Sequence, residues 1–101
     1  MIDDKKIKEY IEKMIDAEKM HNDEGIKKYT NKIVDELGND EDVIISYIDR
    51  LNDEELYDIC VVFLELSKKL NSKTLYEKMR KIEGNHPNVN IHYEVEETYI
   101  S

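Results

Sequence analysis

The chain has 101 residues, of which 40% are hydrophobic and 39% are charged. This length suits one domain over residues 1–101, because two domains of half the size would be near the lower limit for a stable core. Acidic residues outnumber basic ones by 24 to 15, giving a net charge of −9. That charge argues against nucleic acid and against anionic membrane surfaces as partners, since both attract basic proteins.

The cysteine count, the longest apolar run and the first residues together predict the cellular compartment. Cys60 is the single cysteine, so the chain cannot form an intramolecular disulfide. The longest apolar run, residues 59–64, is far shorter than the roughly 20 residues that span a bilayer. Residues 1–6 lead into no apolar segment, so no signal peptide is predicted. We expect a cytoplasmic protein.

Two helices are predicted in the first part of the chain. Apolar side chains recur every three to four positions over residues 7–15 and again over residues 26–37, as on one face of a helix. Asp3 or Asp4 can cap the first helix. Gly38 follows the second pattern directly, where a left-handed terminal residue is expected.

A third and a fourth helix are predicted in the middle of the chain. Residues 39–40 can cap a helix whose apolar face, residues 43–51, includes Val43. Asn52, with Glu55 three residues later, resembles a capping box at the start of the next helix. Apolar side chains from Leu56 to Leu66 then surround most of that helix, a pattern typical of the buried centre of a bundle.

The last third of the chain is less regular. A fifth helix is predicted from residues 71–72 to Gly84. In the tail, residues 89–101, apolar and polar residues alternate as in a strand, yet four residues also share one helical face: Ile91, Val95, Thr98 and Tyr99. The tail is therefore either a sixth helix or an edge strand that pairs with another chain.

These elements predict an all-α domain of five to six short helices. The connections are short, which favours packing as successive antiparallel α-hairpins. The architecture would then be either a HEAT- or TPR-like stack or an irregular bundle.

No catalytic signature is present. The three histidines lack the spacing of a metal site, and the three glycines are too far apart for a phosphate-binding loop. Cys60 lies on the apolar face of the fourth predicted helix, which favours an inert core thiol over a nucleophile. We therefore expect a protein that is not an enzyme, with no catalytic residue, no cofactor, no metal and no small-molecule substrate.

The distribution of charge is the most informative feature. Residues 1–34 and 59–101 each carry equal numbers of acidic and basic residues. Residues 35–58 hold ten acidic residues and one basic residue, Arg50. Acids in the first turn of a helix favour its dipole by about 0.3–1 kcal/mol each, but clustered like charges repel one another. The cluster is either a partner-binding surface or a solvated face.

The candidate partner-binding residues are carboxylates of this segment together with one tyrosine among them: Asp40, Glu41, Asp42, Asp49, Asp53, Glu54, Tyr57 and Asp58. An exposed aromatic ring beside carboxylates is a plausible hot spot for a basic protein partner. An immunity protein or antitoxin that neutralises a basic bacterial toxin would combine small size, acidity and a cytoplasmic location. The alternative is a helical-repeat-like adaptor or regulatory module that binds a peptide in an apolar groove, with Val61 and Val62 as candidates.

Overall fold

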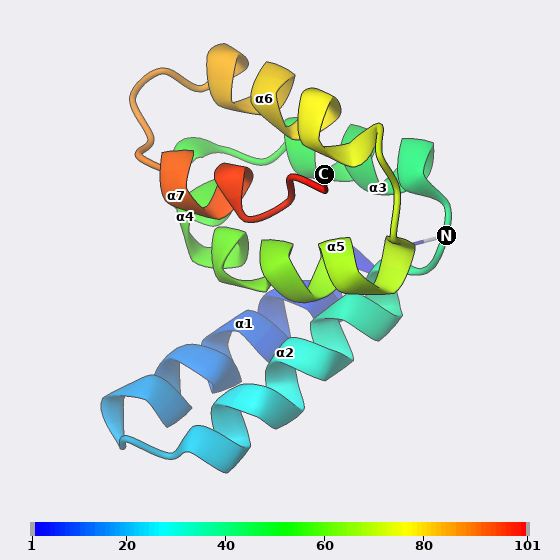
Figure 1. Ribbon diagram of the computed structural model, residues 1–101. Coiled ribbons are helices and arrows are strands. Elements are labelled where there is room, and N and C mark those ends of the chain that lie inside the picture. The colour runs from blue at the N-terminus through cyan, green and yellow to red at the C-terminus, as the bar shows by residue number, and fades with distance from the viewer. Residues whose placement is uncertain (1, 101) are drawn as a thin grey trace. The chain divides into compact units, whose positions relative to one another are not determined.

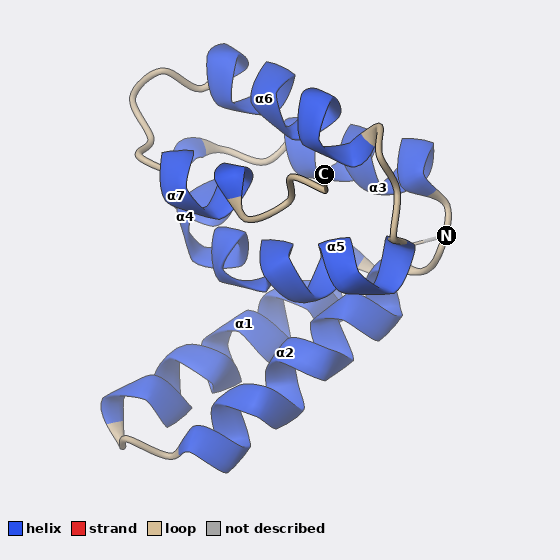
Figure 2. Ribbon diagram, in the orientation of Figure 1, coloured by secondary structure: helices blue, strands red, loops and turns tan. Residues whose placement is uncertain are grey.

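The computed structural model describes residues 2–100, and this part of the chain is helical with no strand (Figures 1 and 2). The all-α fold class is therefore confirmed. No helix in this range is both long and apolar enough to cross a bilayer. The elements are α1 (Asp4–Lys19), α2 (Asp23–Leu37), α3 (Glu41–Asp49), α4 (Asp53–Ile59), a 3₁₀ turn (Cys60–Val62), α5 (Phe63–Leu70), α6 (Leu75–Asn85) and α7 (His92–Glu96).

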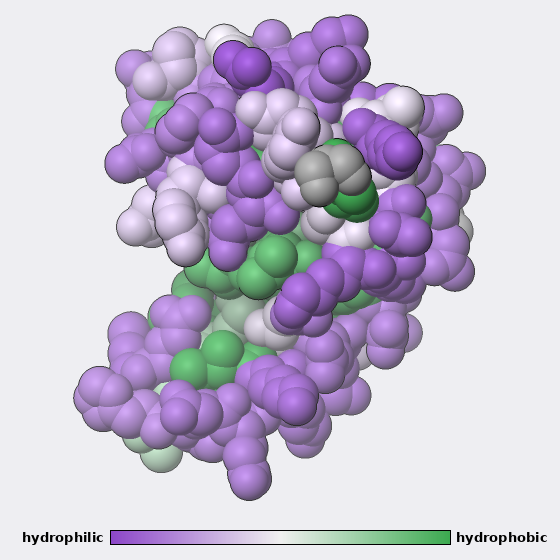
Figure 3. Space-filling view, in the orientation of Figure 1, coloured by the Kyte–Doolittle hydropathy of each residue, from purple (hydrophilic) through white to green (hydrophobic). Residues whose placement is uncertain are grey.

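The chain divides into two compact units, an N-terminal unit (Met1–Gly38) and a C-terminal unit (Asn39–Ser101). The prediction of a single domain over residues 1–101 stays a prediction. Polar and charged side chains cover most of the face seen in the space-filling view (Figure 3), as expected for a chain in which 39% of residues are charged.

The N-terminal unit is an antiparallel hairpin of α1 and α2, as predicted (Figure 1). The Asp3 carboxylate caps α1 by accepting a hydrogen bond from the backbone N–H of Lys6 at 3.2 Å. Asn22 caps α2 in the same way, at 3.0 Å from the N–H of Gly25. The buried side chains of the two helices follow the predicted periodicity: Ile7, Ile11, Met14, Ala17, Ile33, Val34 and Leu37.

Gly38 ends α2 with φ of 84° and ψ of −156°. The positive φ is as predicted, but the ψ value lies outside the left-handed helical region. Side chains other than glycine rarely adopt this combination. A glycine is therefore required where the chain leaves the hairpin.

The C-terminal unit does not continue the series of hairpins. In this unit α3 packs against α6, and α7 packs against α5, α6 and the 3₁₀ turn. Helices that are distant in sequence thus cover one another, which corresponds to the irregular bundle among the predicted architectures. Its fully buried side chains come from every helix: Ile44, Ile48, Leu56, Ile59, Val62, Phe63, Leu66, Leu75, Met79, Ile82 and Val95. Val43, placed on the buried face by the sequence, is 46% exposed.

The predicted fourth helix is divided into α4, the 3₁₀ turn and α5. Two adjacent β-branched residues, Val61 and Val62, occupy the turn, and such residues are weaker helix formers than unbranched ones. A 3₁₀ turn has fewer residues per turn than an α-helix, so it rotates the side chains that follow. Ile59, Val62 and Phe63, at the spacing i, i+3 and i+4, are all fully buried on one face of this segment.

The tail forms a short helix, α7, and not a strand. Ile91, Val95 and Thr98 are fully buried, which confirms three positions of the predicted helical face. Tyr99 was wrongly placed on that face, because its side chain is 62% exposed and its ring packs edge-on against Tyr76 at 5.1 Å between centroids.

The helix before the tail also starts later than predicted. Asn71 has a left-handed conformation, with φ of 46°, which ends α5. Helix α6 therefore begins at Leu75. It then continues through Gly84 to Asn85.

Candidate functional site

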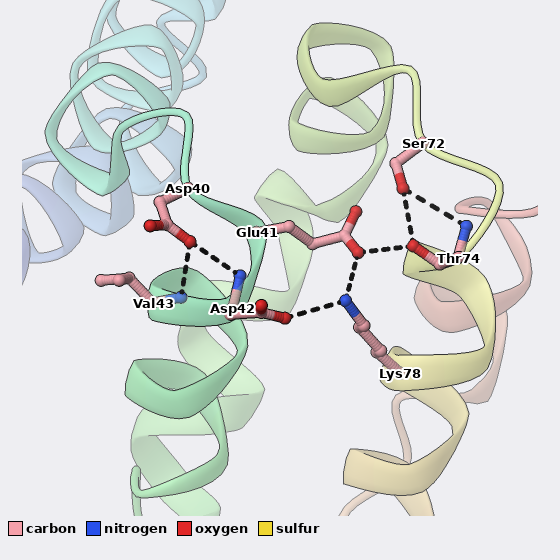
Figure 4. Close-up of polar contacts among 7 residues, drawn as sticks. All are labelled: Asp40, Glu41, Asp42, Val43, Ser72, Thr74 and Lys78. Atoms are coloured by element: carbon pink, nitrogen blue, oxygen red, sulfur yellow. Dashed lines mark hydrogen bonds and ion pairs between the residues drawn. The ribbon is translucent and has the colours of Figure 1, made fainter.

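The first of the predicted partner-binding residues, Asp40, is the N-cap of α3. Its carboxylate accepts hydrogen bonds from the backbone N–H groups of Asp42 at 3.1 Å and Val43 at 3.2 Å (Figure 4). These donors would otherwise lack partners at the start of the helix. Asp40 therefore has a structural task within its own helix.

Glu41 and Asp42 lie against α6, where they share the ammonium group of Lys78 (Figure 4). The Nζ atom of Lys78 is 3.0 Å from Oδ1 of Asp42, and it also donates to Oε2 of Glu41. The hydroxyl of Thr74 donates to the same Glu41 oxygen at 2.6 Å. Two of the seven candidate carboxylates thus join α3 to α6.

The pKa of Glu41 reflects these contacts. Burial by itself would raise this pKa, but the hydrogen bonds from Lys78 and from the hydroxyls of Ser72 and Thr74 lower it to about 2. The side chain of Glu41 is only 16% exposed. Glu41 is therefore ionised at neutral pH and already has a cation as its partner.

Asp49 and Asp53 lie on either side of His86, which follows α6. The Nδ1 atom of His86 is 3.2 Å from Oδ1 of Asp53, and its Nε2 atom is 3.2 Å from the backbone oxygen of Asp49. The amide of Asn85 donates to the Asp49 carboxylate at 3.2 Å. The side chain of His86 is only 12% exposed, so this histidine is part of the contact and not a solvated surface residue.

The three remaining candidates, Glu54, Tyr57 and Asp58, lie on the outer side of α4. We call these residues, together with Val61 in the 3₁₀ turn, the α4 face. Tyr57 is 60% exposed and Val61 is 50% exposed. None of the ion pairs formed within residues 2–100 includes Glu54 or Asp58.

Asp58 is electrostatically unfavourable where it lies. Partial burial raises the pKa of its carboxyl group, and the neighbouring charges of Glu54 and Glu55 raise this pKa further. Glu55 itself belongs to the predicted capping box, which the structure confirms: its side chain accepts from the N–H of Asn52 at 3.0 Å, and its own N–H donates to Asn52 at 2.8 Å.

Cys60 lies just behind the α4 face. Burial, followed by the nearby charges of Glu94 and Asp58, raises the pKa of its thiol to about 12. The thiol donates a hydrogen bond to the backbone oxygen of Tyr57 at 3.0 Å. A thiol this difficult to ionise is a poor nucleophile at neutral pH.

No group of three or more His, Cys, Asp or Glu side chains within residues 2–100 is placed to hold a metal ion. Comparison of the chain with protein-family models, with curated proteins and with solved structures gives no match.

The candidate residues thus separate into two groups. Asp40, Glu41, Asp42, Asp49 and Asp53 have hydrogen-bonding partners within the C-terminal unit. The α4 face presents the exposed ring of Tyr57, the exposed Glu54 and the half-buried Asp58. Lys78 and His86 are the residues that sequence reasoning missed. They lie 37 and 33 positions from their partners Glu41 and Asp53, so no local pattern points to them.

Proposed function

We propose that this protein is a non-enzymatic binding protein that docks a basic protein partner on its α4 face. The observation that carries the proposal is the exposed ring of Tyr57 beside Glu54 and Asp58 on α4, neither of which has an ion-pair partner within residues 2–100. A lysine or arginine of a partner can pair with the carboxylates and lie against the tyrosine ring at the same time.

The raised pKa of Asp58 supports the same proposal. A carboxyl group with a raised pKa destabilises the folded protein at neutral pH, because folding disfavours its charged form. A cation brought by a partner would relieve this repulsion from Glu54 and Glu55. The position is unfavourable for the free protein and favourable for a complex.

The biological role that we propose is that of an immunity protein or antitoxin. Such a protein inhibits a basic toxin by covering its active surface, and charge complementarity raises the rate of association well above that of neutral pairs. The alternative adaptor needs an apolar groove that includes Val61 and Val62. Val62 is fully buried, so charge docking fits the α4 face better.

The test begins with a tagged form of the protein, which is used to isolate a partner from the source cells. Association rates are then measured at about 10 mM and about 150 mM salt, where the Debye length falls from about 30 to about 8 Å. Glu54→Lys with Asp58→Lys should slow association by at least about tenfold at low salt, and by less at high salt. The matched control, Glu12→Lys with Asp16→Lys, changes the net charge equally on α1 and should have a much smaller effect.

Tyr57→Ala should act on dissociation instead. Loss of a central aromatic contact of about 2 kcal/mol corresponds to dissociation about thirtyfold faster. Unchanged association rates in the α4 double variant would refute docking on the α4 face. If the partner binds there but cells that express it grow normally without this protein, binding is supported and the immunity role is refuted.

A further inference from the structure

The N-terminal hairpin has a second surface of opposite character. The rings of Tyr10 on α1 and Tyr29 on α2 lie 6.4 Å apart between centroids and are tilted by 31°. The ammonium group of Lys28 lies 5.3 Å from the centroid of the Tyr29 ring, and that of Lys32 lies 5.7 Å from the centroid of the Tyr10 ring. Lys13 lies 5.9 Å from the Tyr29 centroid. We call these five residues the tyrosine–lysine face.

The lysines of this face are poorly neutralised by the protein itself. Within residues 2–100 no carboxylate forms an ion pair with Lys28 or Lys32, and Lys13 reaches Glu9 only at 3.9 Å. Elsewhere on the same hairpin, Lys8 pairs closely with Asp4 at 3.0 Å. On the tyrosine–lysine face the lysine ammonium groups thus lie near tyrosine rings and have no carboxylate close to them.

The arrangement leaves the cations accessible. Both tyrosine rings are half-buried, whereas Lys13, Lys28 and Lys32 are exposed. An ammonium group over a ring is attracted to the negative face of that ring, so the two tyrosines hold three like charges close together. Such a cluster is complementary to a compact group of negative charges.

We propose that the tyrosine–lysine face binds a short acidic segment of a partner protein. The length of the anion is limited by the surroundings, because residues 1–34 carry eight acids as well as eight bases. A long polyanion such as nucleic acid would extend beyond the three lysines and meet these carboxylates. A few consecutive glutamates or aspartates would cover the face alone, and the tyrosine hydroxyls can donate to their carboxylates.

This inference is independent of the proposed function. The α4 face belongs to the C-terminal unit and attracts cations, whereas the tyrosine–lysine face belongs to the N-terminal unit and attracts anions. Each can therefore be tested while the other is left intact.

The probe is a fluorescein-labelled octaglutamate peptide, and its binding to the full chain is measured by anisotropy at about 20 mM salt. Lys28→Gln with Lys32→Gln should weaken binding by at least about tenfold, because both ammonium groups that lack close carboxylates are removed. The matched control is Lys5→Gln with Lys27→Gln, which removes the same charge from exposed lysines without a tyrosine contact. It should change the affinity less than about twofold. Glu54→Lys with Asp58→Lys should leave the tyrosine–lysine face unchanged and tests its independence.

Amide and ring resonances locate the bound peptide. Octaglutamate should shift the signals of Tyr10 and Tyr29 and of their lysine neighbours, and Tyr29→Leu should weaken binding at least about threefold by removing a ring that holds two of the cations. Circular dichroism confirms that each variant is folded. Undetectable binding, equal affinity in the Lys28/Lys32 variant, or tighter binding of a labelled octathymidylate than of octaglutamate would overturn the proposal, the last in favour of a nucleic acid.

Discussion

The ion pair between α3 and α6 leads to a prediction about acid stability. The Glu41 carboxyl group has a pKa of about 2 in the folded protein against an ordinary 4.5. At about 1.4 kcal/mol per pH unit, this difference sets an upper bound of about 3 kcal/mol. Lys78 is one-third exposed, so solvent screening reduces the expected value to about 1–2 kcal/mol.

The sign follows from the lowered pKa. Stability from Glu41 is fully present above its unfolded value of 4.5 and is lost as the pH falls from there toward 2. Glu41→Gln should therefore lower the free energy of unfolding by about 1–2 kcal/mol at neutral pH and by almost nothing near pH 2.

Urea titrations followed by far-UV circular dichroism at several pH values measure this difference directly. Glu12→Gln, at an exposed position of α1, is the matched control and should stay within about 0.5 kcal/mol of the unmodified protein. The difference in free energy of unfolding between Glu41→Gln and the unmodified protein should vanish near pH 2. If this difference is as large near pH 2 as at neutral pH, the lost stability does not come from the charge of Glu41.

Three further predictions concern the core and the backbone. Phe63→Ala should destabilise the protein by about 3–5 kcal/mol in urea titration, because Phe63 is fully buried; a loss below about 1 kcal/mol would contradict its central place. Cys60, whose pKa burial raises to about 12, should react with a thiol reagent slowly in native buffer and rapidly in denaturant; fast labelling of the folded protein would reverse this assignment. Gly38→Ala should lower the thermal midpoint, because φ is 84° at this position. Gly84→Ala should stabilise the protein by about 0.5–1 kcal/mol, because Gly84 lies inside α6 with open space around the added methyl group. Stability changes of the same sign in both variants would contradict the view that backbone conformation decides the two effects.

Local chemistry made several parts of the fold predictable. An N-cap or a capping box depends on residues within three positions of one another, so Asp3, Asp40 and the pair Asn52 and Glu55 could be identified from the sequence. The helical periodicity likewise identified Phe63 as a buried residue. These features need no knowledge of which helices pack together.

Features that depend on packing could not be predicted. The sequence gives no sign that α3 would lie against α6, and this contact decides the partners of Glu41 and Asp49. The division of the fourth predicted helix has the same origin. A continuous helix over Val62 would fit local propensity almost as well, and no local pattern indicates the 3₁₀ turn at Cys60–Val62.

The acidic segment shows how packing changes the meaning of charge. Counted along the chain, residues 35–58 carry the whole net charge, because residues 59–101 are balanced. In the folded protein Lys78, one of the bases of residues 59–101, forms ion pairs with Glu41 and Asp42 of the acidic segment. The carboxylates of the later helices therefore lose a counter-charge, and the acidic excess extends over the C-terminal unit as a whole.

This redistribution separates the two proposed surfaces electrostatically. The C-terminal unit holds 14 acids and 7 bases, whereas the N-terminal unit holds ten acids and eight bases. The α4 face therefore lies in a field that attracts cations from a distance, and its association should depend steeply on salt. The tyrosine–lysine face lies on a unit whose own acids outnumber its bases by two, so this unit does not attract anions from a distance and the affinity must come from contacts made after encounter. Salt should thus slow association at the α4 face and chiefly speed dissociation from the tyrosine–lysine face.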